Sequence, residues 1–560
     1  MRVYTSQYGD NIGTIARHHH MNVQTLLDAN PHISSLHSLI PGTKVKIPSN
    51  KNKRSSTRES NVPVCPPIPT LDYFDHWIPV SSLEKMAETE YDVLIVGTGA
   101  GGGAALWRLC EELKNTHLRI GVVEAGNLFL STHVMNMATM TEERYRRFWP
   151  NPKFWRTIGA SQFDHNDWGI PSGFLQQFLA VGGRTLLWGG VAPRFHPLDF
   201  VTWPVSIKEM NYYYATAEKV MNVTKRFTEG SSLTQIMLDQ LQKKGFLDAS
   251  DVPMATDLQT TKYGEIHSNV FFSSLQFLGK GFNQKPFDLA VNARCTEVLK
   301  EKGRAVGIKV MTQDQNPYFL RAKHIVLATS ALETPRILLH SKVDGPAIGH
   351  YLTNHSRVFG TGIICRRNFP EVLGTLGILI PKSHERPYQI QMHGPRYYFW
   401  YHNQEKPLRD EWKIELLGSG EVETRFENYL TLNYARTDEF GVPFIDVQFS
   451  YSDKDYEVIQ KMGASIKKAA SAMNALLLSN EQQPPVCLHP PGVEFHEIGT
   501  CRMGDDPNTS AVNRYGQVHG VPGLYVADNS VIPTSGAANP MLTTVALAIR
   551  TADYVIEQLK

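Results

Sequence analysis

The sequence predicts a mixed α/β chain of several domains, and three patterns lead to this class. An apolar, β-branched run at residues 93–96 is followed by glycines, a helical stretch and a second apolar run, which is typical of parallel α/β units. Residues 429–477 read as alternating strands followed by a long amphipathic helix. Residues 1–49 carry a βααβ pattern of their own. The chain has 560 residues, more than one hydrophobic core accommodates, so we expect two or more domains.

Composition narrows the class of partner. Lys and Arg number 56 against 54 Asp and Glu, and this balance gives no electrostatic reason to expect nucleic acid or an anionic membrane surface. No run approaches the roughly 20 apolar residues of a membrane span, and the N-terminus lacks the apolar segment of a secretory signal. The six scattered cysteines form no C-x-x-C pair and read as free thiols of a reducing compartment. We therefore expect cytoplasmic synthesis without export by the general secretory route.

Residues 1–49 are predicted to fold independently. Short β-like runs enclose two helical stretches, Asn22 can cap the second of them, and Pro41-Gly42 turns the chain into the last strand. With "GDNIGTIA", "NVQTLLDANP" and "LIPGTKVKIP", the segment resembles a LysM module, which implies binding of N-acetylglucosamine-containing glycans. A folded appendage without a ligand is the alternative. Residues 50–88, polar and then rich in proline, are predicted to be a linker.

The glycines after residue 96 form the motif Gly97-x-Gly99-x-x-Gly102, and a second strand ends in Glu124. Strand, glycines, helix, strand and acid in this order predict a Rossmann-like dinucleotide-binding domain. Gly97 permits the turn, Gly99 admits a pyrophosphate, and Gly102 allows close helix–strand packing, while the helix N-terminus attracts the phosphates. A carboxylate at Glu124 would bind a ribose diol and repel a 2′-phosphate. This disfavours NADP and leaves FAD and NAD.

Further stretches decide between the two dinucleotides. They are "FLAVGGRTLLWGGVAPRF", "WPVSIKEMNYYYATAEKVM", "AVNARCTEVLKEKGRAVGIKV", "AKHIVLATSALETPRILLHS" and "HEIGTCRMG" with "GVPGLYVADNSVIPTSGAANPM". From about residue 89 to the end, the chain resembles the glucose–methanol–choline (GMC) family of flavin oxidoreductases. The resemblance implies FAD. It implies an FAD-binding domain at residues 89–345 and 491–560 and an antiparallel-sheet substrate domain at 346–490, with the sheet over the flavin including the strands after residue 429.

The fingerprint and the resemblance together imply a set of cofactor-binding residues. They are Gly97, Gly99, Ala100, Gly102, Glu124, Gly182, Gly183, Thr185, Trp188, Gly189, Gly190, Thr296, Asp528, Asn529, Asn539, Pro540 and Met541. Asp528 is expected to hydrogen-bond the ribityl or phosphate region. Leu187 stands where some sugar oxidases of the family carry the histidine that attaches FAD, so we expect non-covalent FAD. Met541 replaces the threonine of the family's "NPT", which removes a hydroxyl contact there.

The resemblance makes His496 the catalytic base and Asn539 its partner. Oxidation of an alcohol requires removal of the hydroxyl proton and transfer of hydride to flavin N5, and neutral imidazole can take that proton near pH 7. The Asn539 amide can donate to the alcohol oxygen. Taken alone, His496 could be a packed core histidine or a metal ligand with Cys501, but further ligands at useful spacing are lacking, so we expect no metal.

These features predict oxidation of an alcohol, specifically a sugar or glycoside hydroxyl, with oxygen or a quinone-like compound as external electron acceptor. The aromatic stretch "RYYFWYHNQ" (396–404) suits sugar stacking, although a buried strand is an equal interpretation. Oxidase and dehydrogenase activity are both left open, as is oligomer formation. The alternative from another class is a glycan-binding protein of a cell wall or spore coat in which flavin chemistry is secondary.

Overall fold

The computed structural model describes residues 2–33, 39–49, 78–137, 154–161, 173–260, 267–365, 367, 375–394, 410–479 and 484–560. The chain divides into two compact units, with the division after Leu71, and each is described by itself. The aromatic stretch at 396–404 lies outside the described residues.

The first unit has the βααβ order that the sequence predicts. Its elements are β1 (Arg2–Thr5), α1 (Ile12–His18), α2 (Val23–Asp28) and β2 (Lys44–Ile47), and the two strands pair antiparallel. Asn11 caps α1 in a capping box, and Asn22 caps α2 as expected. The buried Asn30 side chain donates to the carbonyls of Leu26 and Lys46, which joins the end of α2 to β2. The predicted module fold is confirmed.

The second unit is built on a seven-stranded sheet with the order β12-β4-β3-β15-β14-β13, and β24 also pairs with β15. Its strands are β3 (Glu90–Val96), β4 (Ile120–Val123), β12 (Asp288–Ala290), β13 (Arg294–Glu301), β14 (Arg304–Met311), β15 (Pro317–Leu327) and β24 (Leu524–Val526). The pairs β12–β4, β4–β3, β3–β15 and β15–β24 are parallel, as in doubly wound domains. The predicted Rossmann-like class is confirmed.

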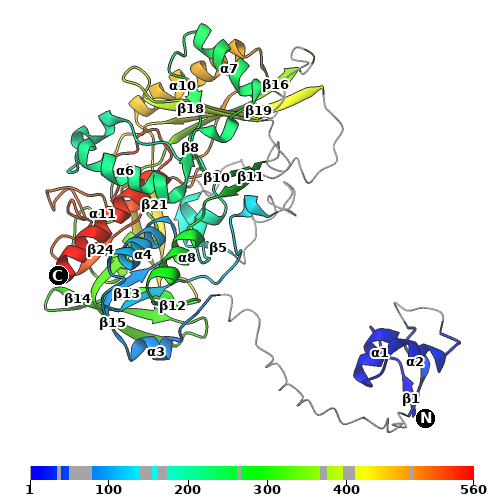
Figure 1. The fold of residues 1–560 in the computed structure, drawn as a ribbon. Helices are drawn as coiled ribbons and strands as arrows, with labels where there is room; N and C mark the ends of the chain where they lie inside the picture. The colour runs from blue at the N-terminus through cyan, green and yellow to red at the C-terminus, as the bar shows by residue number, and fades with distance from the viewer. Residues whose placement is uncertain are drawn as a thin grey trace. The chain divides into compact units, whose positions relative to one another are not determined.

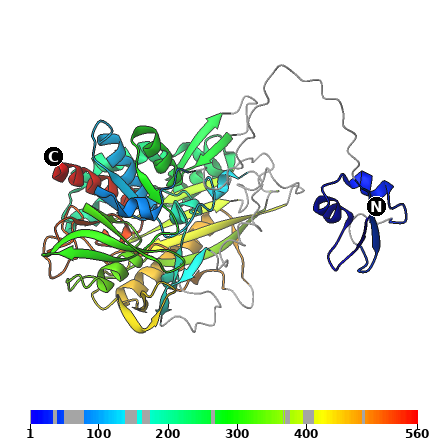
Figure 2. The ribbon, with the colours of Figure 1, turned by 90° about the horizontal axis from the view of Figure 1, so that it is seen from below.

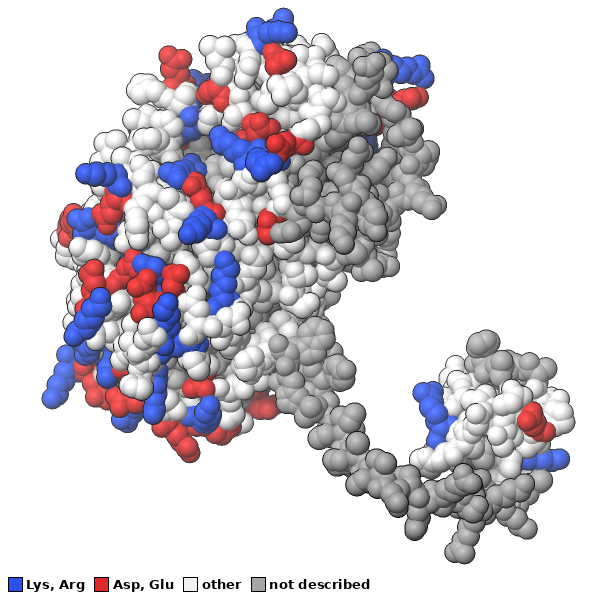
Figure 3. Space-filling model, in the orientation of Figure 1, with Lys and Arg blue, Asp and Glu red and all other residues white. Residues whose placement is uncertain are grey.

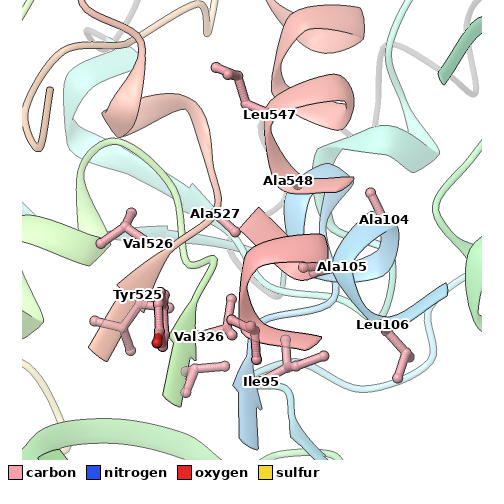
Figure 4. Close-up of a cluster of buried hydrophobic side chains, with 14 of the residues drawn as sticks. Ile95, Ala104, Ala105, Leu106, Val326, Tyr525, Val526, Ala527, Leu547 and Ala548 are labelled. Atoms are coloured by element: carbon pink, nitrogen blue, oxygen red, sulfur yellow. The ribbon is translucent and has the colours of Figure 1, made fainter. Parts of the chain in front are cut away.

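Helices cover this sheet and position the glycine turn. They include α3 (Leu83–Ala87), α4 (Ala100–Glu112), α6 (Ile207–Met221), α8 (Leu275–Gln284), α9 (Glu333–His340) and α11 (Met541–Leu559). Both ribbon views place α11 beside α4 (Figures 1 and 2), although the two helices lie far apart in sequence. The close-up in Figure 4 shows Ala104, Ala105 and Ala548 between these helices. Their small side chains let the helices approach closely above the strand residues Ile95 and Val326.

Helix α3 lies within the segment predicted to be a linker. Leu83 and Met86 are buried, and the Ser81 N–H donates to the Leu289 carbonyl, so this segment packs on the sheet. The folded part therefore begins before residue 89. The domain boundaries at residues 345 and 490 stay predictions.

A second large sheet, antiparallel throughout, has the order β22-β16-β19-β18-β17-β9, with β23 on β16. Its strands are β9 (Ser250–Asp251), β16 (Ser356–Cys365), β17 (Leu376–Ile380), β18 (Tyr388–Gly394), β19 (Glu411–Gly420), β22 (Leu476–Leu477) and β23 (Cys487–Leu488). Helices α7 (Ser232–Lys243) and α10 (Asp453–Ala472) pack on it (Figure 1). On β18, Tyr388, Ile390 and Met392 pack in the core beneath these helices, so by the period of two Gln389 and Gln391 face the other side.

The hairpin after residue 429 is a correction to the sequence-based interpretation. β20 (Tyr429–Thr437) and β21 (Pro443–Gln448) pair with each other and with β6 (Gly159–Ser161) in a separate sheet. Arg336 of α9 holds this hairpin, because its guanidinium contacts Asp438 at 2.8 Å and donates to the Pro443 carbonyl at 2.7 Å. The hairpin is therefore not part of the large antiparallel sheet that contains β16–β19, and the prediction that it belongs to that sheet is wrong.

The remaining strands form small sheets. They are β5 (Trp155–Thr157) with β7 (Gln176–Phe178), and β8 (Val223–Thr224) with β10 (Met254–Thr260) and β11 (His267–Phe271). Acidic and basic side chains intermingle on the face shown in Figure 3. Within the described ranges, no helix has the length and apolar character needed to cross a membrane.

Candidate active site

One cavity of about 970 Å³ joins the glycine turn of α4 to the antiparallel sheet and the C-terminal segment. This is at the upper end of the size of cofactor and ligand sites. Most of the residues that the sequence predicts line it: Gly97, Gly99, Ala100, Glu124, Gly183, Thr185, Trp188, Gly189, His496, Asp528, Asn529, Asn539, Pro540 and Met541. The predicted catalytic pair thus shares a cavity with the dinucleotide fingerprint.

The glycine turn has the shape that a pyrophosphate requires. Gly97 has φ +96°, and a Cβ there would lie 2.5 Å from the Ala328 carbonyl oxygen. A Cβ on Gly102 would lie 2.0 Å from the Gly97 oxygen, so Gly102 serves packing and does not line the cavity. A Cβ on Gly99 would meet nothing within 4 Å, and no side chain caps α4 at this residue. The first N–H groups of α4 are therefore available to an anion.

Glu124 retains one acceptor position. Its Oε2 accepts from the N–H and the hydroxyl of Thr98 at 2.9 and 2.6 Å, and its Oε1 accepts from the Gly126 N–H at 2.9 Å. Burial raises the pKa of Glu124, and these donors together with the charge of Arg294 oppose that rise. Because a carboxylate oxygen accepts two hydrogen bonds, Oε1 can still accept from a ribose hydroxyl. The remaining acceptor position of Glu124 therefore fits the ribose of a dinucleotide.

Asp528 is already saturated. It accepts hydrogen bonds from the backbone N–H of Ser330, the hydroxyl of Thr334, and both the N–H and the hydroxyl of Ser530. These four donors use the acceptor positions of the carboxylate. Although Asp528 lines the cavity, the geometry does not favour the expected hydrogen bond to the ribityl or phosphate region. Its observed effect is to join residues 330–334 to 528–530.

Three other predicted residues lie behind the cavity wall. The Gly182 N–H donates to the Thr98 hydroxyl at 2.9 Å, which connects the glycine segment to the residue that holds Glu124. Gly190 adopts φ +77° beside Met254, and Thr296 is buried on β13. The structure does not bring these residues, or Gly102, to the cavity surface.

His496 is held by a second histidine that sequence patterns did not indicate. The Nδ1 atoms of His496 and His355 are 3.0 Å apart, and His355 Nε2 is 3.0 Å from the Ser535 carbonyl oxygen. A carbonyl can only accept, so His355 carries its proton on Nε2 and accepts at Nδ1. His496 must then donate from Nδ1, which leaves the lone pair on its Nε2. Within the described part of the chain, this Nε2 makes no hydrogen bond, and His496 lines the cavity.

Burial keeps both rings neutral. Desolvation lowers the pKa of His355 to about 4, and the pKa of His496 also lies well below 6.5 because of burial and, secondarily, the neighbouring His355, Arg357 and Arg184. The segment carrying His496 is fixed by Arg184, whose guanidinium is 3.1 Å from the fully buried Glu497 carboxylate. His496 therefore presents an unprotonated nitrogen at pH 7.

Asn539 is oriented by two glutamines from β18. Its Oδ1 accepts from Gln389 Nε2 at 3.1 Å and from Gln391 Nε2 at 2.5 Å. Asn539 lines the cavity, and its Nδ2 makes no hydrogen bond to the other described residues. The amide therefore offers a donor to the same cavity that receives the His496 lone pair. A proton acceptor and a hydrogen-bond donor of this kind suit a hydroxyl group.

The interpretation of His496 and Cys501 as a metal pair gains no support. Cys501 is buried, and its backbone N–H donates to the Ser530 carbonyl. Among the residues that the structure describes, no three His, Cys, Asp or Glu side chains gather in an arrangement that could hold a metal ion.

Residues 170–357 and 424–548 match the two family models of GMC oxidoreductases, and residues 4–48 match the LysM domain. The chain is 26% identical to a C-glycoside 3-oxidase of Microbacterium trichothecenolyticum, over 85% of this chain and 98% of that protein. It is 23% identical to a pyranose 2-oxidase of Tricholoma matsutake, over 68% of this chain and 73% of that protein.

The fold is shared with a solved structure of pyridoxine 4-oxidase from Mesorbium loti, with a TM-score of 0.60 and 15% identity over 83% of this chain and 99% of that one. The family uses FAD, which agrees with the cavity, the glycine turn and the remaining acceptor position on Glu124 Oε1. The chain therefore belongs to the GMC oxidoreductase family, as an enzyme acting on CH–OH donors, and carries an N-terminal LysM domain.

Proposed function

We propose that this enzyme oxidises a hydroxyl group of a sugar or glycoside to a carbonyl, using FAD held without a covalent bond. The observation that carries the proposal is the single cavity shared by the glycine turn and the His496–Asn539 pair. The names of the relatives, C-glycoside 3-oxidase and pyranose 2-oxidase, support a carbohydrate substrate. The substrate side of the cavity also offers several polar partners for a polyhydroxyl ligand, among them Gln391, His393 and Arg357.

The residues that would hold FAD follow from the fit of the cavity. The N–H groups at the start of α4 would bind the pyrophosphate, and Glu124 Oε1 would bind a ribose hydroxyl. When bound, FAD supplies the acceptor of the hydride. Leu187 lines the cavity beside Trp188, and an alkyl side chain offers no nucleophile for attachment, which supports dissociable FAD.

The proton of the substrate hydroxyl would move to His496 Nε2. Asn539 Nδ2 would donate to the same oxygen and stabilise the negative charge that develops there. His355 would keep accepting from His496 Nδ1 as the His496 ring becomes cationic, which favours the charged ring in a buried place. No other described residue needs to give up a proton for this step.

The substrate class can be tested with a panel of free sugars, glycosides and simple aliphatic alcohols. Under anaerobic conditions, sugars or glycosides should bleach the visible absorption of the flavin, because Gln391, His393 and Arg357 can hydrogen-bond their hydroxyls. Admission of air then separates an oxidase, whose colour returns rapidly, from a dehydrogenase. Bleaching by aliphatic alcohols alone would contradict the proposed substrate class.

The pH dependence should reflect the lowered pKa of His496. The neutral ring is the active form, so kcat/KM should remain nearly constant between pH 8 and pH 6. A base with the ordinary histidine pKa of about 6.5 would retain only roughly a quarter of its activity at pH 6. The measurement is kcat/KM against pH, and an inflection near pH 6.5 would disprove the neutral, desolvated base.

Unfolding must be monitored in the same experiment. His133, His355, His393 and His489 all have a folded-state pKa of about 4 because of burial. Their folded-state pKa lies below the unfolded value, so the unfolded chain binds more protons and stability falls as pH drops below about 6.5. Melting temperatures across the series separate loss of fold from protonation of His496.

The LysM unit is proposed to attach the enzyme to N-acetylglucosamine-containing glycan, as in a cell wall or spore coat. Tyr8 and Ile40 are 95% and 80% exposed on neighbouring turns, which are joined because the Ser6 hydroxyl donates to the Ile40 carbonyl at 2.7 Å. An exposed aromatic ring beside an exposed aliphatic chain suits the C–H faces of sugar rings.

Tyr8→Ala in the full chain should therefore weaken co-sedimentation with insoluble chitin or peptidoglycan by about tenfold, the loss typical of a binding hot spot. Alcohol oxidation should stay unchanged. Tyr212→Ala, at a 60% exposed position of the second unit, is the matched control. If both variants sediment like the parent, this surface does not bind the glycan. If turnover falls with Tyr8→Ala, the unit is more than a tether.

A further inference from the structure

We propose that Gln389 is a positioning residue that fixes the direction of the Asn539 amide from behind. The inference rests on the proposed function, because it assigns to Asn539 Nδ2 the role of donor to the substrate oxygen. Gln389 is 2% exposed and does not line the main cavity, so it would act only through Asn539.

The hydrogen bonds around Asn539 have one consistent polarity. His393 Nε2 is 3.3 Å from Gln391 Oε1, Gln391 Nε2 is 2.5 Å from Asn539 Oδ1, and Gln389 Nε2 is 3.1 Å from the same Oδ1. With the His393 proton on Nε2, each N–H in this chain faces an oxygen. Rotation of the Asn539 amide by 180° would direct its NH₂ group at two other NH₂ groups, and this loses both hydrogen bonds in a buried place.

The direction of the amide decides its chemistry. With Oδ1 held by the two glutamines, Nδ2 is the atom offered to the cavity, where it can donate to an oxygen that gains negative charge. In the rotated amide, Oδ1 would face that oxygen and repel it. Gln391 alone leaves one hydrogen bond to set the direction, so Gln389 supplies the second constraint.

Gln389 also contacts space away from the main cavity, and Lys382 and Asp199 are among the residues that line this space. Besides Asn539, Gln389 borders a second cavity of about 360 Å³ lined by Leu379, Ala537 and Ala538 among others. A leucine or glutamate at this position can extend toward that space, and the melting temperature of each variant checks that the fold is kept. With the melting temperature unchanged, the effect of a substitution reports on the Asn539 amide.

The experiment compares Gln389→Leu and Gln389→Glu with the parent, using the most reactive alcohol of the panel. Gln389→Leu should lower kcat about tenfold with little change in KM, because a partly rotated amide loses much of the transition-state contact while substrate contacts elsewhere persist. Gln389→Glu should lower kcat further, since its carboxylate attracts Nδ2 and promotes the rotated amide. Its kcat should recover as pH falls and the carboxylate becomes protonated, which a purely structural role would not produce. The charged groups on the other side of this carboxylate are Lys382 and Asp199, and Lys382 is already paired with Asp199 and Glu421.

Two comparisons complete the test. In an Asn539→Ala background, Gln389→Leu should have no further effect, because there is no amide left to direct. Tyr388→Phe, on the same strand but bonded to Ser465 of α10, should leave kcat unchanged. The inference is overturned if Gln389→Leu has the parent's kcat, or lowers kcat equally with and without Asn539. A parent enzyme that no alcohol reduces would instead refute the proposed function.

Discussion

His496→Ala is expected to lower kcat for alcohol oxidation by about 10³-fold while FAD stays bound. His355 Nδ1 accepts a hydrogen bond from His496 Nδ1–H, so the lone pair of His496 is on Nε2. Because His496 lines the cavity, Nε2 is the base that a substrate hydroxyl can reach. General base catalysis typically contributes 10²–10⁴-fold, and alanine removes the acceptor entirely. The measurement is the single-turnover rate of flavin bleaching by a saturating alcohol under anaerobic conditions.

The matched control for this substitution is His519→Ala. His519 contacts Ser510 and the Gly504 carbonyl and does not line the cavity, so its loss should leave the bleaching rate unchanged. Flavin content and melting temperature should match the parent in both variants. If His496→Ala bleaches as fast as the parent, the base has been assigned to the wrong residue.

Gly99→Leu is expected to abolish FAD binding and leave a folded apoprotein. The backbone at Gly99 (φ −63°, ψ −164°) is open to any residue, and its missing Cβ points into empty space within the cavity. A leucine side chain there would occupy the place where the pyrophosphate meets the start of α4. Flavin absorbance per protein after purification, and the affinity of the apoprotein for added FAD, should both fall at least 100-fold.

Gly279→Leu is the comparison for this loss, because a Cβ at Gly279 also meets nothing within 4 Å but the residue lies on α8 away from the cavity. It should bind FAD like the parent. Full flavin content in Gly99→Leu would place the dinucleotide elsewhere.

Acid precipitation of the parent should release the flavin into solution, as expected for Leu187 at the attachment position.

Where sequence-based prediction succeeded, the interactions are local. The positive φ of Gly97 and the close approach of Gly102 to the Gly97 oxygen lie within one turn, and Glu124 follows on the adjacent parallel strand. The βααβ order of the first unit also follows from caps and turns within 49 residues. Short-range sterics and hydrogen bonding fix such features.

Where the prediction failed, a distant partner decided the outcome. The hairpin after residue 429 alternates as a sheet strand should, but the buried contacts of Arg336 with Asp438 and Pro443 attach it to α9. Asp528 stands at the expected place in the sequence, but Ser330 and Thr334, nearly two hundred residues earlier, occupy its carboxylate. The spacing of residues near each position in the sequence does not indicate either contact.

The sequence by itself determined the α/β class, the glycine turn, the LysM unit and the candidacy of His496 and Asn539, because residue type and short-range spacing suffice for these. Only the tertiary structure decided how the two site residues are held. His355 stands 141 positions from His496, and Gln389 and Gln391 stand 150 and 148 positions from Asn539. The tautomer of an imidazole and the direction of an amide depend on which hydrogen-bond partner is nearest in space, and folding alone brings these partners together.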